Sequence, residues 1–216
     1  VGGDGLEVWD LEGGRAERRL KHTVCELGRA DRARVRAVSN ADLTSVRNRG
    51  KFSATSVATL RVGRRRVGAV DLAGNHLLCG MQDGSVWVWD TNSYEVSACL
   101  LDAPRHSKAH AGPLKVVGNL VLHGSIDGAI RVYDAASFTL LHTLRAHRGP
   151  VLGLAVQSEG TRVVSCGSDG AAVEWEMASL TATTAMQGHE GGVAGAASDM
   201  SGHIITACID GSIRTW

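Results

Sequence analysis

The chain has 216 residues, of which 44% are hydrophobic, and a formal net charge of only +1. These values are typical of a soluble globular protein. No apolar run reaches the length of a transmembrane helix and no secretory signal opens the chain, so we expect no membrane partner and an intracellular location, cytoplasmic or nuclear.

The N-terminal third shows the weakest pattern. Residues 1–23 predict the end of a partial repeat, with strands at Leu6–Asp10 and Ala16–Leu20. Residues 24–66 contain no Asp-Gly turn, no Trp and no sustained alternation. An Arg-rich insertion of about forty residues or a decayed repeat would each explain this length. The lack of strand chemistry favours an exposed, irregular insertion, although a translated non-coding stretch would look the same.

From residue 67 onward the chain repeats one unit, in which Asp-Gly separates two alternating apolar runs. The acidic residues of these turns, Asp83, Asp127, Asp169 and Asp210, follow one another at steps of 44, 42 and 41 residues. Asp-Gly between such runs predicts a β-hairpin, and we expect a type I′ turn with positive φ at both residues. The predicted repeats span residues 67–101, 110–145, 147–187 and 189–216.

The alternation predicts four strands in each of the first three repeats and three in the last. In chain order they are Val67–Leu72, His76–Gly80, Ser85–Trp89 and Tyr94–Leu100; Pro113–Val117, Leu120–Gly124, Ala129–Tyr133 and Phe138–Leu144; Val151–Val156, Thr161–Ser165, Ala171–Trp175 and Leu180–Met186; and Gly192–Ala197, Ile204–Ala207 and Ser212–Trp216.

The unit resembles a WD40 repeat: a Gly-His pair, two strands, a tight Asp turn and a strand that ends in Trp-Asp. The stretch from Gly188-His189 to Trp216 fits this pattern best, and the stretch from Ala146-His147 to Glu176 is nearly as good. The resemblance implies an all-β, WD40-type β-propeller with four recognisable blades and an N-terminal partial blade. We expect a fragment of a larger propeller; the alternative is a small ring whose N-terminal strands complete the last blade.

The resemblance also implies a hydrogen-bonded tetrad within each blade. Two full tetrads are expected, His147, Ser165, Asp169 and Trp175, and His189, Thr206, Asp210 and Trp216. Two partial ones are expected, His110, Asp127 and Tyr133 with His123 at the hydroxyl position, and Asp83 and Trp89 with Cys79 there. A Ser-His-Asp set also suggests a catalytic triad. We favour the structural interpretation, because the set recurs in each repeat and accepts Ser or Thr alike.

Motifs for metals and cofactors are absent from the sequence. It has no Cys-x-x-Cys pair and no phosphate-binding Gly-rich loop, and its five cysteines predict free thiols. His106 and His110 lie four residues apart, but no third ligand is indicated near them. We therefore expect no metal site, no cofactor, no small-molecule substrate and no enzymatic activity.

The function favoured by the sequence is a non-catalytic scaffold that presents propeller loops to protein or peptide partners. The candidate partner-binding residues lie in the turns and after the blade-start histidines: Gln82, Ile126, Ser168, Ile209, Arg148 and Glu190. The alternative is binding of nucleic acid or an acidic partner by residues 28–66. That segment has eleven Lys or Arg against two Asp or Glu, a net charge of +9.

Overall fold

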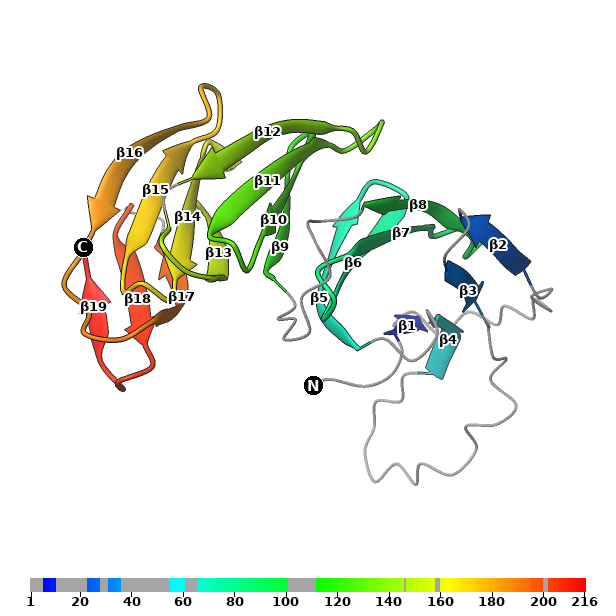
Figure 1. Ribbon diagram of the computed structural model, residues 1–216, viewed down its shortest axis with the longest axis horizontal. Coiled ribbons are helices and arrows are strands. Elements are labelled where there is room, and N and C mark those ends of the chain that lie inside the picture. The colour runs from blue at the N-terminus through cyan, green and yellow to red at the C-terminus, as the bar shows by residue number, and fades with distance from the viewer. Residues whose placement is uncertain are drawn as a thin grey trace.

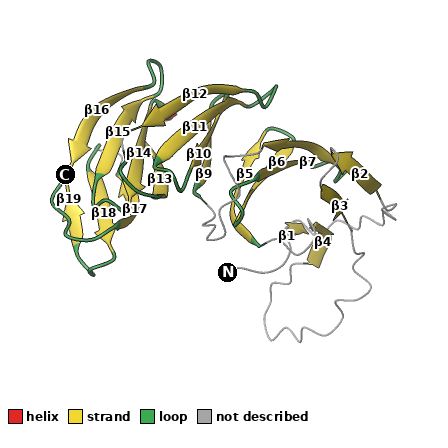
Figure 2. Ribbon diagram, in the orientation of Figure 1, coloured by secondary structure: helices red, strands yellow, loops and turns green. Residues whose placement is uncertain are grey.

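The computed structural model describes residues 66–100, 112–145, 147–157, 160–199 and 202–216, and four strands nearer the N-terminus. Those four are β1 (Leu6–Asp10), β2 (Thr23–Leu27), β3 (Asp31–Val35) and β4 (Thr55–Leu60). Every element in these parts of the chain is a strand (Figures 1 and 2), as expected for an all-β fold. Among the described residues no helix is long and apolar enough to cross a membrane.

Four antiparallel sheets follow one another along the chain, and in each of them strands that are consecutive in sequence pair. Sheet 1 consists of β5 (Val67–Ala73), β6 (His76–Met81), β7 (Val86–Asp90) and β8 (Val96–Leu100). Sheet 2 consists of β9 (Leu114–Val117), β10 (Leu120–Gly124), β11 (Ala129–Asp134) and β12 (Leu140–Arg145). Sheet 3 consists of β13 (Val151–Gln157), β14 (Arg162–Gly167), β15 (Ala172–Glu176) and β16 (Thr181–Met186). Sheet 4 consists of β17 (Val193–Ser198), β18 (Ile204–Cys208) and β19 (Ile213–Thr215).

The Asp-Gly turns join the second and third strands of each sheet, but they are not type I′ turns. In sheet 3, Gly170 has φ +79° while Asp169 is not among the residues with positive φ. The N–H of Gly170 donates to Gly167 O (3.3 Å) and the N–H of Gly167 to Ala171 O (3.0 Å). This is a three-residue loop, in which a type I turn is followed by a left-handed glycine. The other three Asp-Gly turns repeat both hydrogen bonds.

A second turn recurs between the third and fourth strands of sheets 1, 2 and 3. It places a bulky residue at positive φ, namely Tyr94 (+58°), Phe138 (+57°) and Leu180 (+54°). Such residues rarely adopt this conformation. Each of the three side chains packs against a hydrophobic cluster of buried residues, and this packing offsets the backbone cost.

Neighbouring sheets are held together by apolar clusters that span the interface between them. Val117, Leu122 and Ile130 of sheet 2 pack with Val163 and Trp175 of sheet 3. A second cluster joins sheets 1 and 2, and a third joins sheets 3 and 4. Because side chains alternate along a strand, each inner sheet presents one apolar face to the preceding sheet and one to the following sheet. This is the packing expected of radially arranged blades.

The four sheets follow one another in an arc that is not closed (Figure 1). Among the described strands β19 pairs only with β18, and the N-terminal strand β1 pairs with β4 in a separate two-stranded sheet. The small-ring alternative is therefore wrong, since the described N-terminal strands do not complete sheet 4. The predicted strand at Ala16–Leu20 lies outside the described residues.

Residues 24–66 contain more regular structure than their sequence suggested. Strands β2 and β3 form a hairpin, and β4 runs antiparallel to β1. The Leu60 side chain is only 1% exposed and packs in a cluster with Trp87 and Trp89 of sheet 1. The strand has a local reason, because Thr55–Leu60 includes β-branched residues, whereas the burial of Leu60 comes from its contacts with sheet 1.

Candidate functional site

Sheet 3 brings its four expected tetrad residues into one hydrogen-bonded chain. The indole N–H of Trp175 donates to Ser165 Oγ (2.9 Å), and this hydroxyl lies 2.7 Å from His147 Nε2. The other ring nitrogen, Nδ1, lies 3.1 Å from Asp169 Oδ1. The tetrad therefore links the loop before β13 to strands β14 and β15 and to the turn between them.

The geometry of this tetrad does not suit a nucleophilic serine. Ser165 is fully buried, at 0% exposure, and its hydroxyl accepts a hydrogen bond from Trp175 while facing the His147 ring. A serine nucleophile needs access to a substrate carbonyl and oxyanion donors beside it. Instead, the Ser165 hydroxyl gives a hydrogen-bond partner to two buried ring nitrogens, Trp175 Nε1 and His147 Nε2. Leaving such buried nitrogens unpaired would destabilise the fold.

Asp169 is held in its ionised form by its neighbours. Burial alone would raise the pKa of Asp169, but hydrogen bonds from Arg148 N–H, the His147 ring and Ala171 N–H together bring this pKa below its ordinary value of 3.8. A carboxylate with a lowered folded-state pKa stabilises the fold above its unfolded pKa. That stability is lost as the pH falls through the folded value.

We therefore expect the stability gap between the parent and an Asp169→Asn variant to narrow in acid. Urea midpoints measured from about pH 5 down to about pH 2 should differ most at the upper end, where the parent carboxylate is ionised. The two midpoints should approach each other at the lower end. The other carboxyl groups titrate in both proteins, so the difference between the two urea midpoints reports on Asp169. A gap that stays constant with pH would contradict this role.

Sheet 4 forms only part of the same chain. Trp216 Nε1–H donates to Thr206 Oγ1 (2.9 Å), which lies 2.7 Å from His189 Nε2. His189 Nδ1, however, faces the Ser212 hydroxyl (3.1 Å) instead of bonding to Asp210. The Asp210 carboxylate accepts from the backbone N–H of Ser212 (2.7 Å). The fourth expected member is therefore near the others without joining their chain.

Sheets 1 and 2 depart further from the expected tetrads. In sheet 1 the Asp83 carboxylate accepts from Ser85, whose hydroxyl accepts from Trp87 Nε1 (3.1 Å). Trp89 Nε1 is buried without a hydrogen-bond partner in the described part of the chain, as Cys79 stands at the hydroxyl position.

In sheet 2 the Asp127 carboxylate pairs with Arg131 (3.0 Å), and His123 is buried at 1% exposure. Tyr133 is buried in the cluster between sheets 1 and 2. His110 and His106 lie outside the described residues, so the expected His110 member of this tetrad stays a prediction.

The Asp-Gly turns and the loops before β13 and β17 lie against one another and form a continuous surface. We define this turn-side strip as the turns at residues 125–129, 167–171 and 208–212 with the loops at residues 147–150 and 187–192. Backbone hydrogen bonds join some of these parts, namely Val151 N–H to Ser125 O (3.0 Å), Ser168 N–H to Pro150 O (2.9 Å) and Ile209 N–H to Gly192 O (3.0 Å). The turn of sheet 3 packs closely against the loop before β17, since a Cβ at Gly170 would lie 2.9 Å from His189 O. The strip thus runs across sheets 2, 3 and 4.

Five of the six candidate partner-binding residues are exposed on the turn-side strip: Ile126, Arg148, Ser168, Glu190 and Ile209. Ile209 is 71% exposed and Ile126 is 39% exposed, although both are large apolar residues. Gln82 lies in the corresponding turn of sheet 1 and is half-buried, and its N–H donates to Arg66 O (2.9 Å).

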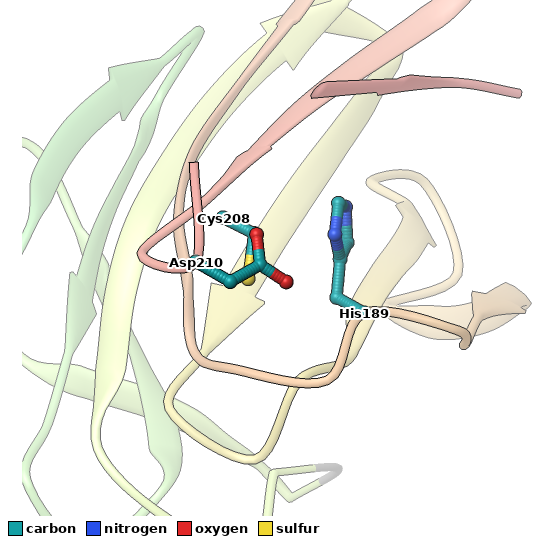
Figure 3. Close-up of side chains that lie close together, drawn as sticks. All are labelled: His189, Cys208 and Asp210. Carbon is teal, nitrogen blue, oxygen red and sulfur yellow. The ribbon is translucent and has the colours of Figure 1, made fainter. Parts of the chain in front are cut away.

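A cluster that sequence reasoning missed lies in sheet 4, where His189, Cys208 and Asp210 converge (Figure 3). One potential metal-ligating atom from each of the three residues lies within 4.8 Å of the other two. The sequence carried a signal for it. Cys208 stands two residues before Asp210, where sheet 3 has Gly167 before Asp169.

Comparisons with known proteins agree with the blade architecture. The sequence model of the family described as "WD domain, G-beta repeat" matches residues 138–176 and 180–216. No curated protein matches the chain.

Many solved structures share the fold with this chain, among them the following three. The computationally designed Ika4 protein is 22% identical with a TM-score of 0.60, and the match covers 69% of this chain and 89% of that one. The RRP9 WD40 repeats are 21% identical with a TM-score of 0.63, covering 72% and 49%. A chain of the mitotic checkpoint complex is 24% identical with a TM-score of 0.65, covering 85% and 55%.

The chain spans about half the length of the last two of these proteins. At such identities the likeness concerns the fold, while the family match is carried by the two C-terminal repeats. Residues 138–176 and 180–216 therefore match WD40 repeats, and the chain folds as blades of a WD40-type β-propeller.

Proposed function

We propose that the chain is a non-catalytic scaffold that binds a protein or peptide partner on the turn-side strip. The observation that carries this proposal is the pair of isoleucines at the tips of two Asp-Gly turns, Ile126 and Ile209, exposed on a surface whose turns and loops contact one another across three sheets. Scaffolding is also the general role of WD40 propellers. Because sheets 2 and 3 beneath the strip are packed on both faces, a partner would meet a largely preformed surface and little ordering cost would oppose binding.

The residues between the two isoleucines indicate what kind of partner fits. Arg148 places one positive charge on the strip, whereas negative charges come from Glu190 and from the turn residues Asp127, Asp169 and Asp210. Such a surface suits a segment with apolar anchors and an excess of positive charge, rather than an acidic one. Free cysteines at positions 79, 99, 166 and 208 fit a reducing, intracellular setting, which we include in the proposal.

A peptide-display selection against the 216-residue chain tests the proposal. Selected peptides should bind the parent and lose at least about tenfold in affinity when Ile209→Asp or Ile126→Asp is introduced, because an apolar anchor site gains a charge. Leu141→Asp is the matched control. Leu141 is 45% exposed on β12, away from the turns, and the same change there should leave affinity unchanged.

Circular dichroism of the three variants would show that they remain folded. Peptides that bind all variants equally, or that lose affinity only with Leu141→Asp, would place the binding surface elsewhere and overturn the proposal.

Binding of nucleic acid or an acidic partner by residues 28–66 is the second candidate, favoured by their net charge of +9. Deleting the whole segment is a poor test, since it would remove the buried Leu60 from the cluster beside sheet 1. Replacing arginines of residues 28–54 by glutamine avoids this. The second candidate requires that these replacements abolish salt-sensitive retention on heparin, whereas the scaffold proposal requires that peptide binding to the strip persists.

A further inference from the structure

Three side chains from separate parts of sheet 4 converge at one end of the turn-side strip (Figure 3). His189 comes from the loop before β17, Cys208 ends β18, and Asp210 lies in the turn that follows. They offer one imidazole nitrogen, one sulfur and one carboxylate oxygen, all within 4.8 Å of one another. Of these three residues, His189 is hydrogen-bonded to Thr206, which also accepts from Trp216. Cys208 and Asp210 are not part of that hydrogen-bonded chain.

Sheet 3 shows what sheet 4 would look like without the thiol. There His147 Nδ1 and Asp169 Oδ1 lie 3.1 Å apart. A Cβ at Gly167 would lie 2.3 Å from His147 Nδ1 and 2.4 Å from Asp169 Oδ1, so a direct His-Asp contact requires glycine at that position. Sheet 4 has Cys208 there, and its side chain occupies the place where the two partners would meet.

The His189 ring is held so that one nitrogen faces this cluster. Its Nε2 lies 2.7 Å from Thr206 Oγ1, an atom that also accepts from Trp216 Nε1 (2.9 Å). A metal-binding imidazole commonly uses one nitrogen as ligand while the other is hydrogen-bonded and orients the ring. His189 Nδ1, the other ring nitrogen, faces the Ser212 hydroxyl (3.1 Å).

The carboxylate is ionised at neutral pH. The Ser212 side chain and backbone N–H and the Cys208 thiol donate to Asp210 and lower its pKa to about 2. Asp210 is exposed, so its carboxylate can rotate toward an ion without disturbing the core.

We propose that His189 Nδ1, Cys208 Sγ and the Asp210 carboxylate bind a divalent transition-metal ion of the zinc class. Nitrogen, sulfur and oxygen ligands together suit Zn²⁺, which takes four ligands in tetrahedral sites. With bonds of about 2.0–2.3 Å, ligand atoms lie roughly 3.3–3.8 Å apart, so small side-chain rotations close this cluster on an ion. Water or the Ser212 hydroxyl would complete the set. The ion would join the loop before β17 to the β18–β19 turn, as the His-Asp contact does in sheet 3.

Titration of the untagged 216-residue chain with Zn²⁺ against a chromophoric chelator tests the proposal, with Co²⁺ as a spectroscopic probe. We expect one Zn²⁺ per chain, and a sulfur-to-metal charge-transfer band when Co²⁺ is bound. Cys208→Gly should abolish that band and weaken Zn²⁺ binding at least about tenfold, since it removes a ligand. Asp210→Asn should also weaken binding at least about tenfold. Cys166→Ala removes a buried thiol from sheet 3 and should leave affinity within about twofold.

Cys208→Gly recreates the residue found in sheet 3, and Asp210 is exposed, so at least the second variant keeps the fold intact. Circular dichroism checks this. Several outcomes would overturn the proposal: no binding by the parent at about millimolar Zn²⁺, unchanged affinity in Asp210→Asn, a Co²⁺ complex without a sulfur band, or an equal loss in Cys166→Ala.

Discussion

A Gly128→Ala variant should lose about 3 kcal/mol or more of its unfolding free energy. Gly128 has φ +80°, a conformation that costs an L residue roughly 1–2 kcal/mol. A Cβ at this position would also lie 2.4 Å from the carbonyl oxygen of His147 and 3.0 Å from that of Gly149. Both atoms belong to backbone, so the loop before β13 would have to move, and it carries the tetrad residue His147.

Two glycines at the same turn position separate the collision from the strain. Gly170 has φ +79°, and its Cβ would meet His189 O at 2.9 Å, whereas Gly211 has φ +89° and no atom within 4 Å. Urea unfolding of the three alanine variants should give the order Gly128, Gly170, Gly211 from largest to smallest loss, with about 1 kcal/mol for Gly211→Ala. Equal losses of unfolding free energy in the three variants would contradict this prediction. They would mean that the left-handed backbone conformation alone accounts for the loss, without any collision with the neighbouring loops.

The strands of sheets 1 to 4 were predictable from sequence to within about two residues, because alternating apolar runs were bounded by turn residues. Leu120–Gly124 is reproduced with both ends correct. The turn type was not predictable. Asp-Gly is compatible with a two-residue type I′ loop and with a three-residue loop that ends in a left-handed glycine, and only the hydrogen bonds distinguish them.

Local sequence preferences also failed to predict the backbone conformation of Phe138 and the burial of Leu60. A phenylalanine at positive φ contradicts its intrinsic preference, and here packing against the cluster between sheets 1 and 2 overrides it. Leu60 lies in a segment whose overall composition suggested an exposed insertion, yet its burial depends on contacts with residues about twenty to thirty positions further along the chain. Composition of a window carries no information about such contacts.

The hydrogen bonds of the candidate site could be predicted where a repeat follows the family pattern, as in sheet 3. They could not be predicted in sheet 4, where one residue of the pattern is replaced. The resemblance to a WD40 repeat implied that His147, Ser165 and Asp169 would be hydrogen-bonded, and they are. The same expectation failed for His189 and Asp210, because Cys208 replaces the glycine on which direct contact depends. Aligning the repeats by their turn aspartates would have shown that difference.

A Ser165→Ala variant should lose about 2–4 kcal/mol of unfolding free energy, although it removes a single oxygen. Two buried ring nitrogens, Trp175 Nε1 and His147 Nε2, would lose their partner at once. Each buried polar group left unpaired costs about 1–3 kcal/mol. Ser179→Ala is the matched control, because Ser179 lies in the exposed turn before β16 of the same sheet and its loss should change stability by less than about 0.5 kcal/mol.

A double-mutant cycle shows whether the loss comes from the hydrogen-bonded chain or from the small cavity that Ser165→Ala leaves. In a Trp175→Phe background the indole donor is gone, so removing the hydroxyl leaves one fewer buried nitrogen unpaired. Ser165→Ala should then cost at least about 1 kcal/mol less than in the parent, as coupled neighbours do. Additive losses in urea unfolding would show that the Ser165 hydroxyl does not stabilise the sheet through Trp175. The tetrad would then be a consequence of the packing between β14 and β15 and not one of its causes.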